Sequence, residues 1–187
     1  MKQIILVILS FLLVTTLLLT KAAYAQESTP GPIEYSEKVL DEEAEAATLY
    51  KRTVDWSENH FTYTPKATLQ ADAAKGEVRM TGTVKIKTIS TSGQIQERPV
   101  VFEFSFHTVP TGGYEYNVGF FRVILDTKKP DETIPVEEYI TQLATDKNNA
   151  RTHNDRRVMA QSNSLASEIA MSFRSYMNSR PAPGAVE

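Results

Sequence analysis

The chain has 187 residues, of which 41% are hydrophobic and 23% charged, and its formal net charge is −3. This composition is typical of a soluble globular domain, and it excludes a collagen, a disordered tail and a membrane protein with several spans. The sequence contains no cysteine, so disulfides, thiolate zinc sites and cysteine nucleophiles are excluded together.

The first 25 residues are typical of an export signal. Lys2 supplies a positive charge, an apolar run extends from Ile4 to Leu19, and Ala23-Tyr24-Ala25 gives the small-x-small pattern that signal peptidase reads. The run of sixteen residues is shorter than the roughly 20 that a membrane span needs. We therefore expect cleavage between Ala25 and Gln26 and a periplasmic or secreted bacterial protein with no stable membrane span. The alternative is an uncleaved anchor helix.

Cleavage changes the charge balance of the chain. It removes Lys2 and Lys21, which leaves 18 basic and 23 acidic side chains and a net charge of −5. Nucleic-acid binding depends on neutralising phosphates, so nucleic acid is not an expected partner. The composition predicts flexible ends at 26–32 and 181–187, with a single domain over 33–180 between them.

The first predicted elements are a strand over 33–40 and a helix from 44 to about 60. Asp41 is expected to cap this helix, and the apolar residues that follow have helical spacing. The period then changes to two, with a modest strand over 67–71 and a turn over 74–77. In the next strand the apolar residues share one face, with Gly82 among them: Val78, Met80, Val84 and Ile86.

Residues 89–98 are polar and predict a loop. The strand after this loop has an apolar face formed by Val100, Phe102, Phe104 and Phe106. A hairpin turn at Pro110–Gly113 leads into a strand from Tyr114 to about Asp126. The apolar residues change parity after Gly119, which predicts a bulge there.

A loop over 128–135 and a short helix over 136–145 precede the last predicted helix. This helix is expected to begin with Asn154 as its cap and to end near Ser179, with an apolar stripe along one side. The order β-α-β-β-β-β-α predicts an α+β fold of two layers. An antiparallel sheet of about five strands has two long helices on one face and water on the other.

A set of features along the predicted elements stands out: the Tyr35-to-Val39 strand, Leu49-Tyr50, Trp56, Phe61, Asp72, Gly76, Gly82 and Tyr114-Glu115-Tyr116. In these features the chain resembles a family of exported bacterial domains of unknown function, which are assigned a fold like that of the TATA-binding protein (TBP-like). The resemblance covers about 33–126 well and the last helix loosely. It implies a fold and a compartment, and it carries no catalytic residue. It does not imply DNA binding, because a fold does not determine a function.

The sequence contains no spaced motif for a metal, a cofactor or a catalytic nucleophile. Its three histidines, His60, His107 and His153, include no pair at helical spacing, and HExxH and G-x-S-x-G are absent. We therefore expect no metal, no cofactor and no enzymatic activity. The alternatives are a Glu-and-His site, a serine hydrolase or a pair of carboxylates that folding brings together.

The strongest local charge feature is the run from Arg151 to Arg157, which includes Arg156. Cations at the start of a helix oppose its dipole, so the run calls for an explanation. Arg156 and Arg157 are candidates to contact anionic lipid head groups or an acidic partner. An ion pair with the acidic start of the first helix would also relieve the strain, and a solvated loop is the simpler alternative.

The aromatic residues of the last two long strands allow two interpretations. They either form core beneath a helix or line a pocket for an apolar ligand: Phe102, Phe104, Phe106, Tyr114, Tyr116 and Phe120. Glu115, Asn117 and Arg122 are expected on the wet face of the sheet. The candidate partner surface therefore comprises Tyr114, Tyr116, Arg122, Arg156 and Arg157.

Three functions are compatible with this sequence. The leading hypothesis is a non-enzymatic binding or assembly module of the bacterial envelope, which contacts an envelope protein, a glycan or a lipid. The runner-up is a periplasmic carrier of a small apolar ligand held between the sheet and the helices. The third is a hydrolase with dispersed carboxylates.

Overall fold

The computed structural model of the protein describes residues 31–63 and 68–179. The expected cleavage site at Ala23 and Ala25 and the two polar ends therefore lie outside the described residues, apart from Gly31 and Pro32. In this part of the chain no helix is both long enough and apolar enough to cross a membrane.

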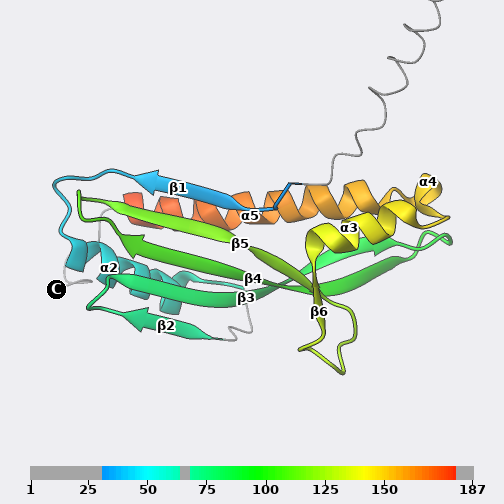
Figure 1. The fold of residues 1–187 in the computed structure, drawn as a ribbon, viewed down its shortest axis with the longest axis horizontal. Helices are drawn as coiled ribbons and strands as arrows, with labels where there is room; N and C mark the ends of the chain where they lie inside the picture. Colours follow the sequence, from blue (N-terminus) through cyan, green and yellow to red (C-terminus); the bar gives the residue numbers. More distant parts are fainter. Residues whose placement is uncertain (1–30, 64–67, 180–187) are drawn as a thin grey trace, which may run out of the picture. The chain divides into compact units, whose positions relative to one another are not determined.

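The described residues form one antiparallel sheet (Figure 1). Its strands are β1 (Tyr35–Val39), β2 (Leu69–Asp72), β3 (Glu77–Ile89), β4 (Ile95–Thr108), β5 (Tyr114–Ile124) and β6 (Thr133–Pro135). The strand order is β1-β5-β4-β3-β2, and β6 pairs with β5 beyond the end of β1. The predicted α+β class and antiparallel sheet are confirmed.

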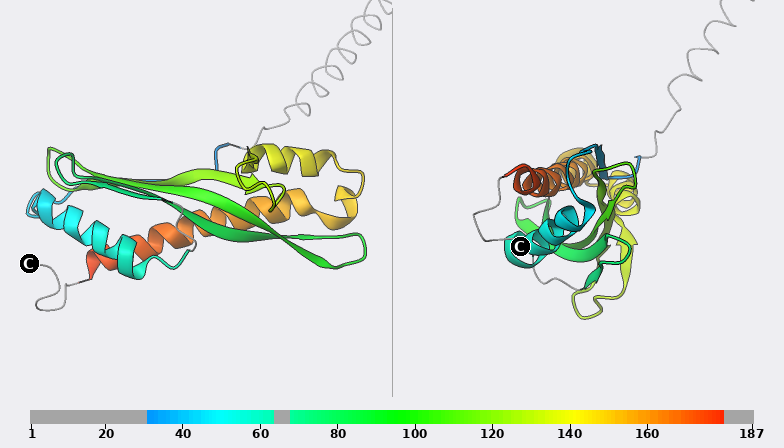
Figure 2. Two further views of the ribbon diagram at one scale, coloured as in Figure 1. Left: turned by 90° about the horizontal axis from the view of Figure 1, so that it is seen from below. Right: turned by 90° about the vertical axis from the view of Figure 1, so that its left-hand side faces the viewer.

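The helices are α2 (Ala46–Asp55), α3 (Val136–Thr145), α4 (Asn149–Thr152) and α5 (Asn154–Asn178). A π-helical turn, Trp56–His60, continues α2. Figure 2 shows α2 and α5 on the same face of the sheet, with α5 running along it. The predicted bounds of α3 agree with the structure, because Pro135 ends the preceding strand and the acidic Glu137 and Glu138 suit the positive end of a helix.

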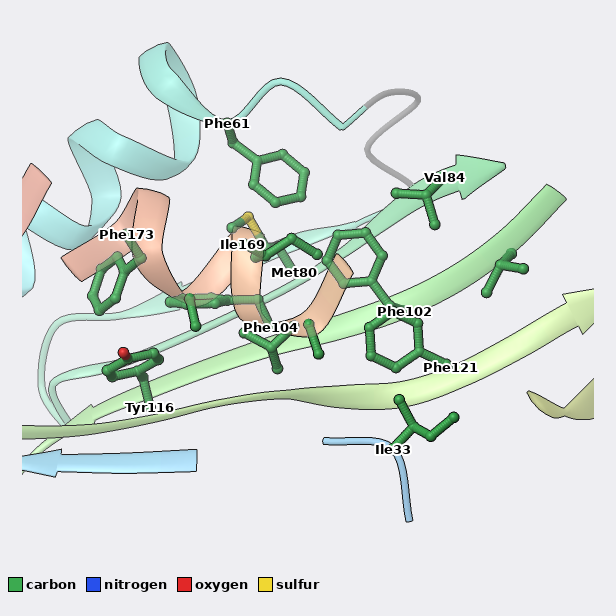
Figure 3. Packing of buried hydrophobic residues seen from close by; sticks show 14 of the residues in the cluster. Ile33, Phe61, Met80, Val84, Phe102, Phe104, Tyr116, Phe121, Ile169 and Phe173 are labelled. Carbon is green, nitrogen blue, oxygen red and sulfur yellow. The ribbon is translucent and has the colours of Figure 1, made fainter. Parts of the chain in front are cut away.

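The core lies between the sheet and the helices because every second residue of the long strands faces that side. Val78, Met80 and Ile86 of β3 are fully buried, and so are Phe102 and Phe104 of β4. Figure 3 shows Met80, Phe102 and Phe104 packed against Phe61, which follows the π-helical turn, and against Ile169 and Phe173 of α5. The period-two pattern of the sequence therefore identified the buried face correctly.

Two predicted loops are partly wrong. Half of residues 89–98 are strand, since β3 continues to Ile89 and β4 begins at Ile95, with a tight turn closed by Ser90 and Gln94. Their polar composition reflects exposure to solvent. This hairpin extends beyond the part of β3 that pairs with β2, and residues 91–97 are exposed. Likewise, the segment predicted as a loop over 128–135 contains β6, which is too short to show a period.

Two predicted helix caps are wrong. Asp41 accepts hydrogen bonds from the backbone N–H groups of Glu43 and Ala44, so it stabilises a turn before α2, whose N-cap is Glu45. Asn154 is the first residue of α5 and its amide bonds Ile89 of β3, while His153, at φ 50°, occupies the N-cap position. In both cases the side chain hydrogen-bonds other backbone groups that lie close to it, instead of the free N–H groups of the predicted helix start.

The predicted bulge near Gly119 is confirmed. Gly119 pairs with Glu103 and Arg122 pairs with Val101, so two residues of β5 oppose the single residue Phe102 of β4. Phe120 lies in this bulge at φ 53°, a left-handed conformation that is unusual for a bulky residue, and it is 74% exposed. The bulge keeps Phe121 in the core and turns Phe120 out to solvent.

Candidate interaction surfaces

Tyr114 and Tyr116 were predicted on a partner surface, and the structure places both in the core instead. They are only 2% and 1% exposed, because their parity on β5 is that of the face beneath the helices. The Tyr116 hydroxyl donates to Glu37 at 2.7 Å, and Glu37 also pairs with Arg174 of α5. These tyrosines therefore join β5 to β1 and α5 and offer no surface to a partner.

The aromatic rings fill the space between the sheet and the helices. The Phe173 ring of α5 has its centroid 4.9 Å from those of Phe104 and Tyr116, and 5.0 Å from that of Trp56. Such edge-to-face pairs are typical of a close-packed interior. Of the sequence's two interpretations of these aromatics, the core is the one that the packing supports, except for the exposed Phe120.

Arg122 lies on the open side of the sheet, as expected, and it has a structural partner there. Its guanidinium donates to the hydroxyl and the carbonyl oxygen of Thr133, at 2.7 and 3.0 Å. These bonds hold β6 against β5. Arg122 is exposed, so it is available to a partner only as part of this β5–β6 unit.

The face of the sheet opposite the core carries polar residues in rows that cross five strands. Pairing places one row in register along Ser36, Asn117, Ser105, Arg79 and Gln70. The neighbouring row carries most of the charge of this part of the face: Lys38, Glu115, His107, Glu77 and Asp72. We call these two rows the open face. The sequence predicted that one face of the sheet is exposed to water. Which residues of that face lie in one row depends on the order and register of the strands, which the structure provides.

A second surface lies at the end of the domain where α5 begins. Arg156 and Arg157 are exposed there, next to the β3–β4 hairpin, and Lys87 of that hairpin lines a hollow with both of them. Figures 1 and 2 place the acidic start of α2 at the opposite end. The predicted ion pair between Arg156 or Arg157 and that acidic segment is therefore wrong. No pattern in the sequence indicated that Lys87 lies beside these arginines.

Charged groups also connect α2 to the C-terminal end of α5. Arg52 is buried and donates to the backbone carbonyls of Tyr176 and Ser179, both at 2.6 Å, so it caps α5 from a neighbouring helix. The Tyr176 hydroxyl donates to Asp55, and this bond lowers the pKa of Asp55. His60 lies 3.7 Å from the same carboxylate. The group holds the two helices together.

Two of the three histidines of the described residues, His60 and His107, each lie near a single carboxylate. His60 pairs with Asp55 as above, and His107 lies 3.8 Å from Glu115 on the open face. Within residues 31–63 and 68–179, no group of three or more potential ligands is close enough to hold a metal ion.

No protein-family model matches this sequence, and no curated protein is similar to it. Solved structures with a similar fold include a DUF4468 family protein from Bacteroides ovatus, with a TM-score of 0.55 and 16% identity over 85% of this chain and 95% of that one. A TBP-like protein from Parabacteroides distasonis has a TM-score of 0.52 and 11% identity over 82% of this chain and 100% of that one.

The chain has a TBP-like fold. The predicted resemblance to a bacterial family of unknown function with this fold is therefore confirmed. At such low identity the similarity concerns the fold alone, and it transfers no site residue and no activity to this chain.

Proposed function

We propose that this protein is an exported, non-enzymatic binding or assembly module of the bacterial cell envelope. The observation that carries the proposal is the filled interior, in which Phe173 packs against the rings of Trp56, Phe104 and Tyr116. A carrier of an apolar ligand needs a cavity of several hundred Å³ at this position. With the interior occupied by side chains, the surface is the part of the domain left for recognition. The export-signal pattern at the N-terminus supports the location.

The open face is the surface that we assign to a protein or glycan partner. It combines hydroxyl, amide and charged groups in register, and the short edge strands β1 and β2 flank it. Such groups form directional hydrogen bonds, and a flat polar face suits a flat polar partner better than a small apolar molecule.

Site-specific photocrosslinking in the native cell tests this assignment. We expect a benzoylphenylalanine at Ser105, in the middle of the open face, to give a discrete adduct with a protein or glycan of the envelope. The matched control is the same group at Ser164, an exposed serine on α5. Adducts from Ser164 alone would move the contact surface to the helical layer and contradict the proposal.

The location is tested separately by cell fractionation and by mass spectrometry of the N-terminus. We expect the protein in the periplasmic or secreted fraction, with Gln26 as its first residue. A cytoplasmic protein that still begins at Met1 would overturn the envelope role, whatever the crosslinks show.

A further inference from the structure

Two segments far apart in the sequence meet at one end of the domain. The tip of the β3–β4 hairpin, residues 85–98, lies beside residues 146–157, which lead through α4 into α5 (Figure 1). The Asn154 amide exchanges two hydrogen bonds with the backbone of Ile89, at 2.8 and 2.9 Å. The two segments are thus fixed to each other, and we call them together the basic end.

The basic end has the opposite charge to the rest of the chain. Its two segments carry seven Lys and Arg against three Asp and Glu, a net charge of +4. The other residues carry 13 basic and 20 acidic side chains, a net charge of −7. A separation of this size indicates an oriented electrostatic interaction with a negative partner.

Internal ion pairs neutralise only part of this charge: Lys85 pairs with Glu97 at 2.9 Å, whereas the arginines of the second segment have no such partner among the described residues. Arg151, Arg156 and Arg157 are exposed, and none of them forms an ion pair with another described residue. Asp155 directly precedes Arg156 in the chain. Desolvation raises the pKa of Asp155, but hydrogen bonds and the charges of Arg156 and His153 outweigh this effect and lower the pKa. The positive end of the α5 dipole adds to the repulsion among the arginines. Such an arrangement opposes stability, and residues that oppose stability are characteristic of functional sites.

Two open hollows lie between the cations. One, of about 320 Å³, is bounded by the hairpin turn from Ile89 to Gly93, by Arg151 and by Arg157. The other, of about 500 Å³, has Lys87, Arg156 and Arg157 on its walls. Each hollow is large enough for a phosphate group, and Arg157 belongs to both. The hydroxyl groups of the hairpin turn add donors that suit phosphate oxygens.

We propose that the basic end docks on the phosphate head groups of an anionic membrane surface. A lipid surface fits better than a single soluble anion because the cations spread across an exposed end and converge on no enclosed site. Clusters of four to eight basic residues are typical of proteins that bind anionic lipid. The proposal rests on the envelope location proposed above, because only there would the protein meet this membrane surface. The vesicle assay below does not require that location.

Co-sedimentation with vesicles tests the proposal. The protein, prepared from Gln26 to Glu187, is mixed with phosphatidylcholine vesicles that either contain or lack phosphatidylglycerol, at low and at high salt. We expect binding only to the anionic vesicles, and we expect salt to weaken it. The test variant is Arg151→Gln/Arg156→Gln/Arg157→Gln. Each arginine near the surface contributes about fivefold, so affinity is expected to fall roughly 100-fold.

The control variant Lys51→Gln/Lys75→Gln/Lys128→Gln changes the net charge equally, at exposed positions that lie outside both the basic end and the two rows of the open face. We expect it to bind like the wild type. Thermal unfolding checks the fold of both variants, and the arginine variant is expected to unfold at the same or a higher temperature, because it relieves repulsion at the helix start.

Three outcomes would overturn the proposal. They are no binding to anionic vesicles, an equal loss in the control variant, and binding that inorganic phosphate abolishes at the ionic strength of a chloride control. The last would assign the basic end to a soluble phosphate ligand. The vesicle assay uses purified components and does not involve the open face. A negative result would therefore overturn the lipid proposal without affecting the crosslinking test of the open face.

Discussion

Gly82 shows how one residue permits the close packing of the core. A Cβ atom at this position would lie 2.6 Å from the Cζ atoms of both Phe61 and Phe102. Contacts of that length force at least one ring to move. The glycine in an otherwise apolar strand face therefore reflects a close approach of two aromatic rings to the backbone.

We expect Gly82→Ala to destabilise the domain by about 1–3 kcal/mol, since it overpacks a filled core. Urea unfolding at neutral pH measures the change. Gly31→Ala is the control, because its Cβ meets nothing within 4 Å, and a change within about 0.5 kcal/mol is expected. Adding Phe61→Leu to the Gly82→Ala variant should recover part of the loss. A double variant with fully additive losses would contradict the steric explanation.

Tyr176 makes the stability of the domain depend on pH in the alkaline range. Burial, and then the hydrogen bond to Asp55, raise the pKa of Tyr176 to about 12. A raised pKa means that folding favours the neutral phenol. This stabilisation is complete below the unfolded pKa of about 10 and is lost as the pH rises toward the folded value.

We therefore expect the wild type to lose stability more steeply between about pH 10 and 12 than the Tyr176→Phe variant. Urea unfolding across this range measures the two slopes. Tyr50→Phe, a change on α2, serves as the control and should keep the wild-type slope. Equal slopes for the wild type and Tyr176→Phe would rule out the proposed linkage.

At the scale of elements, α5 protects an edge of the sheet with amide side chains. Beyond the end of β2, no strand of the described residues pairs with the outer edge of β3. Gln161 exchanges hydrogen bonds with the backbone of Lys87, at 2.9 and 2.8 Å, and Asn154 does the same with Ile89. Each amide imitates one residue of a neighbouring strand. The helix thereby covers an edge that would otherwise pair with other chains.

Asn154→Ala and Gln161→Ala are each expected to cost about 1 kcal/mol, because backbone groups of β3 lose their partners. Asn163→Ala is the control: it removes an amide from the same helix that bonds only a carbonyl within α5. Hydrogen exchange gives a second readout, in which the amides of Lys87 and Ile89 should exchange faster in the corresponding variants. Unchanged exchange would mean that these bonds do not protect the edge.

The hairpin around Ser90 explains why the ends of β3 and β4 next to the turn escaped sequence analysis. Alternation of apolar and polar residues reveals a strand only where one of its faces is buried. Residues 91–97 are exposed throughout, so no alternation is present. Backbone pairing with β3 makes Ile95, Gln96 and Glu97 part of a strand, and backbone pairing leaves no mark on composition.

At the scale of the whole domain, Phe173 connects the two layers. Its ring contacts Trp56 beside α2, Phe104 and Phe106 of β4, and Tyr114 and Tyr116 of β5. A single side chain of α5 thus touches three other elements. Its loss leaves a cavity at the centre of the core rather than at its rim.

We expect Phe173→Ala to destabilise the domain by about 3–5 kcal/mol and to keep a single cooperative transition. Met171→Ala, on the same helix and 63% exposed, should change stability by no more than about 0.5 kcal/mol. Chemical unfolding followed by tryptophan fluorescence suits this test, because Trp56 lies against Phe173. A loss of less than about 1 kcal/mol would show that α5 contributes little to the shared core.

The sequence alone determined which residues of β3 and β4 face the core, which segments are the main helices and strands, and where β5 bulges. These features depend on the local period of apolar residues and on turn residues such as Gly119. Both signals can be recognised within a single segment of the chain. It misassigned Tyr114 and Tyr116 to a surface, although their parity placed them with the phenylalanines of the core.

Only the tertiary structure decided how distant segments combine. The rows of the open face depend on the strand order, and the basic end depends on the hairpin lying beside the start of α5. The same holds for the amides of Asn154 and Gln161, which serve a strand more than sixty residues away. The physical reason is that strand pairing and charge proximity are relations between segments, and periodicity describes only one segment at a time.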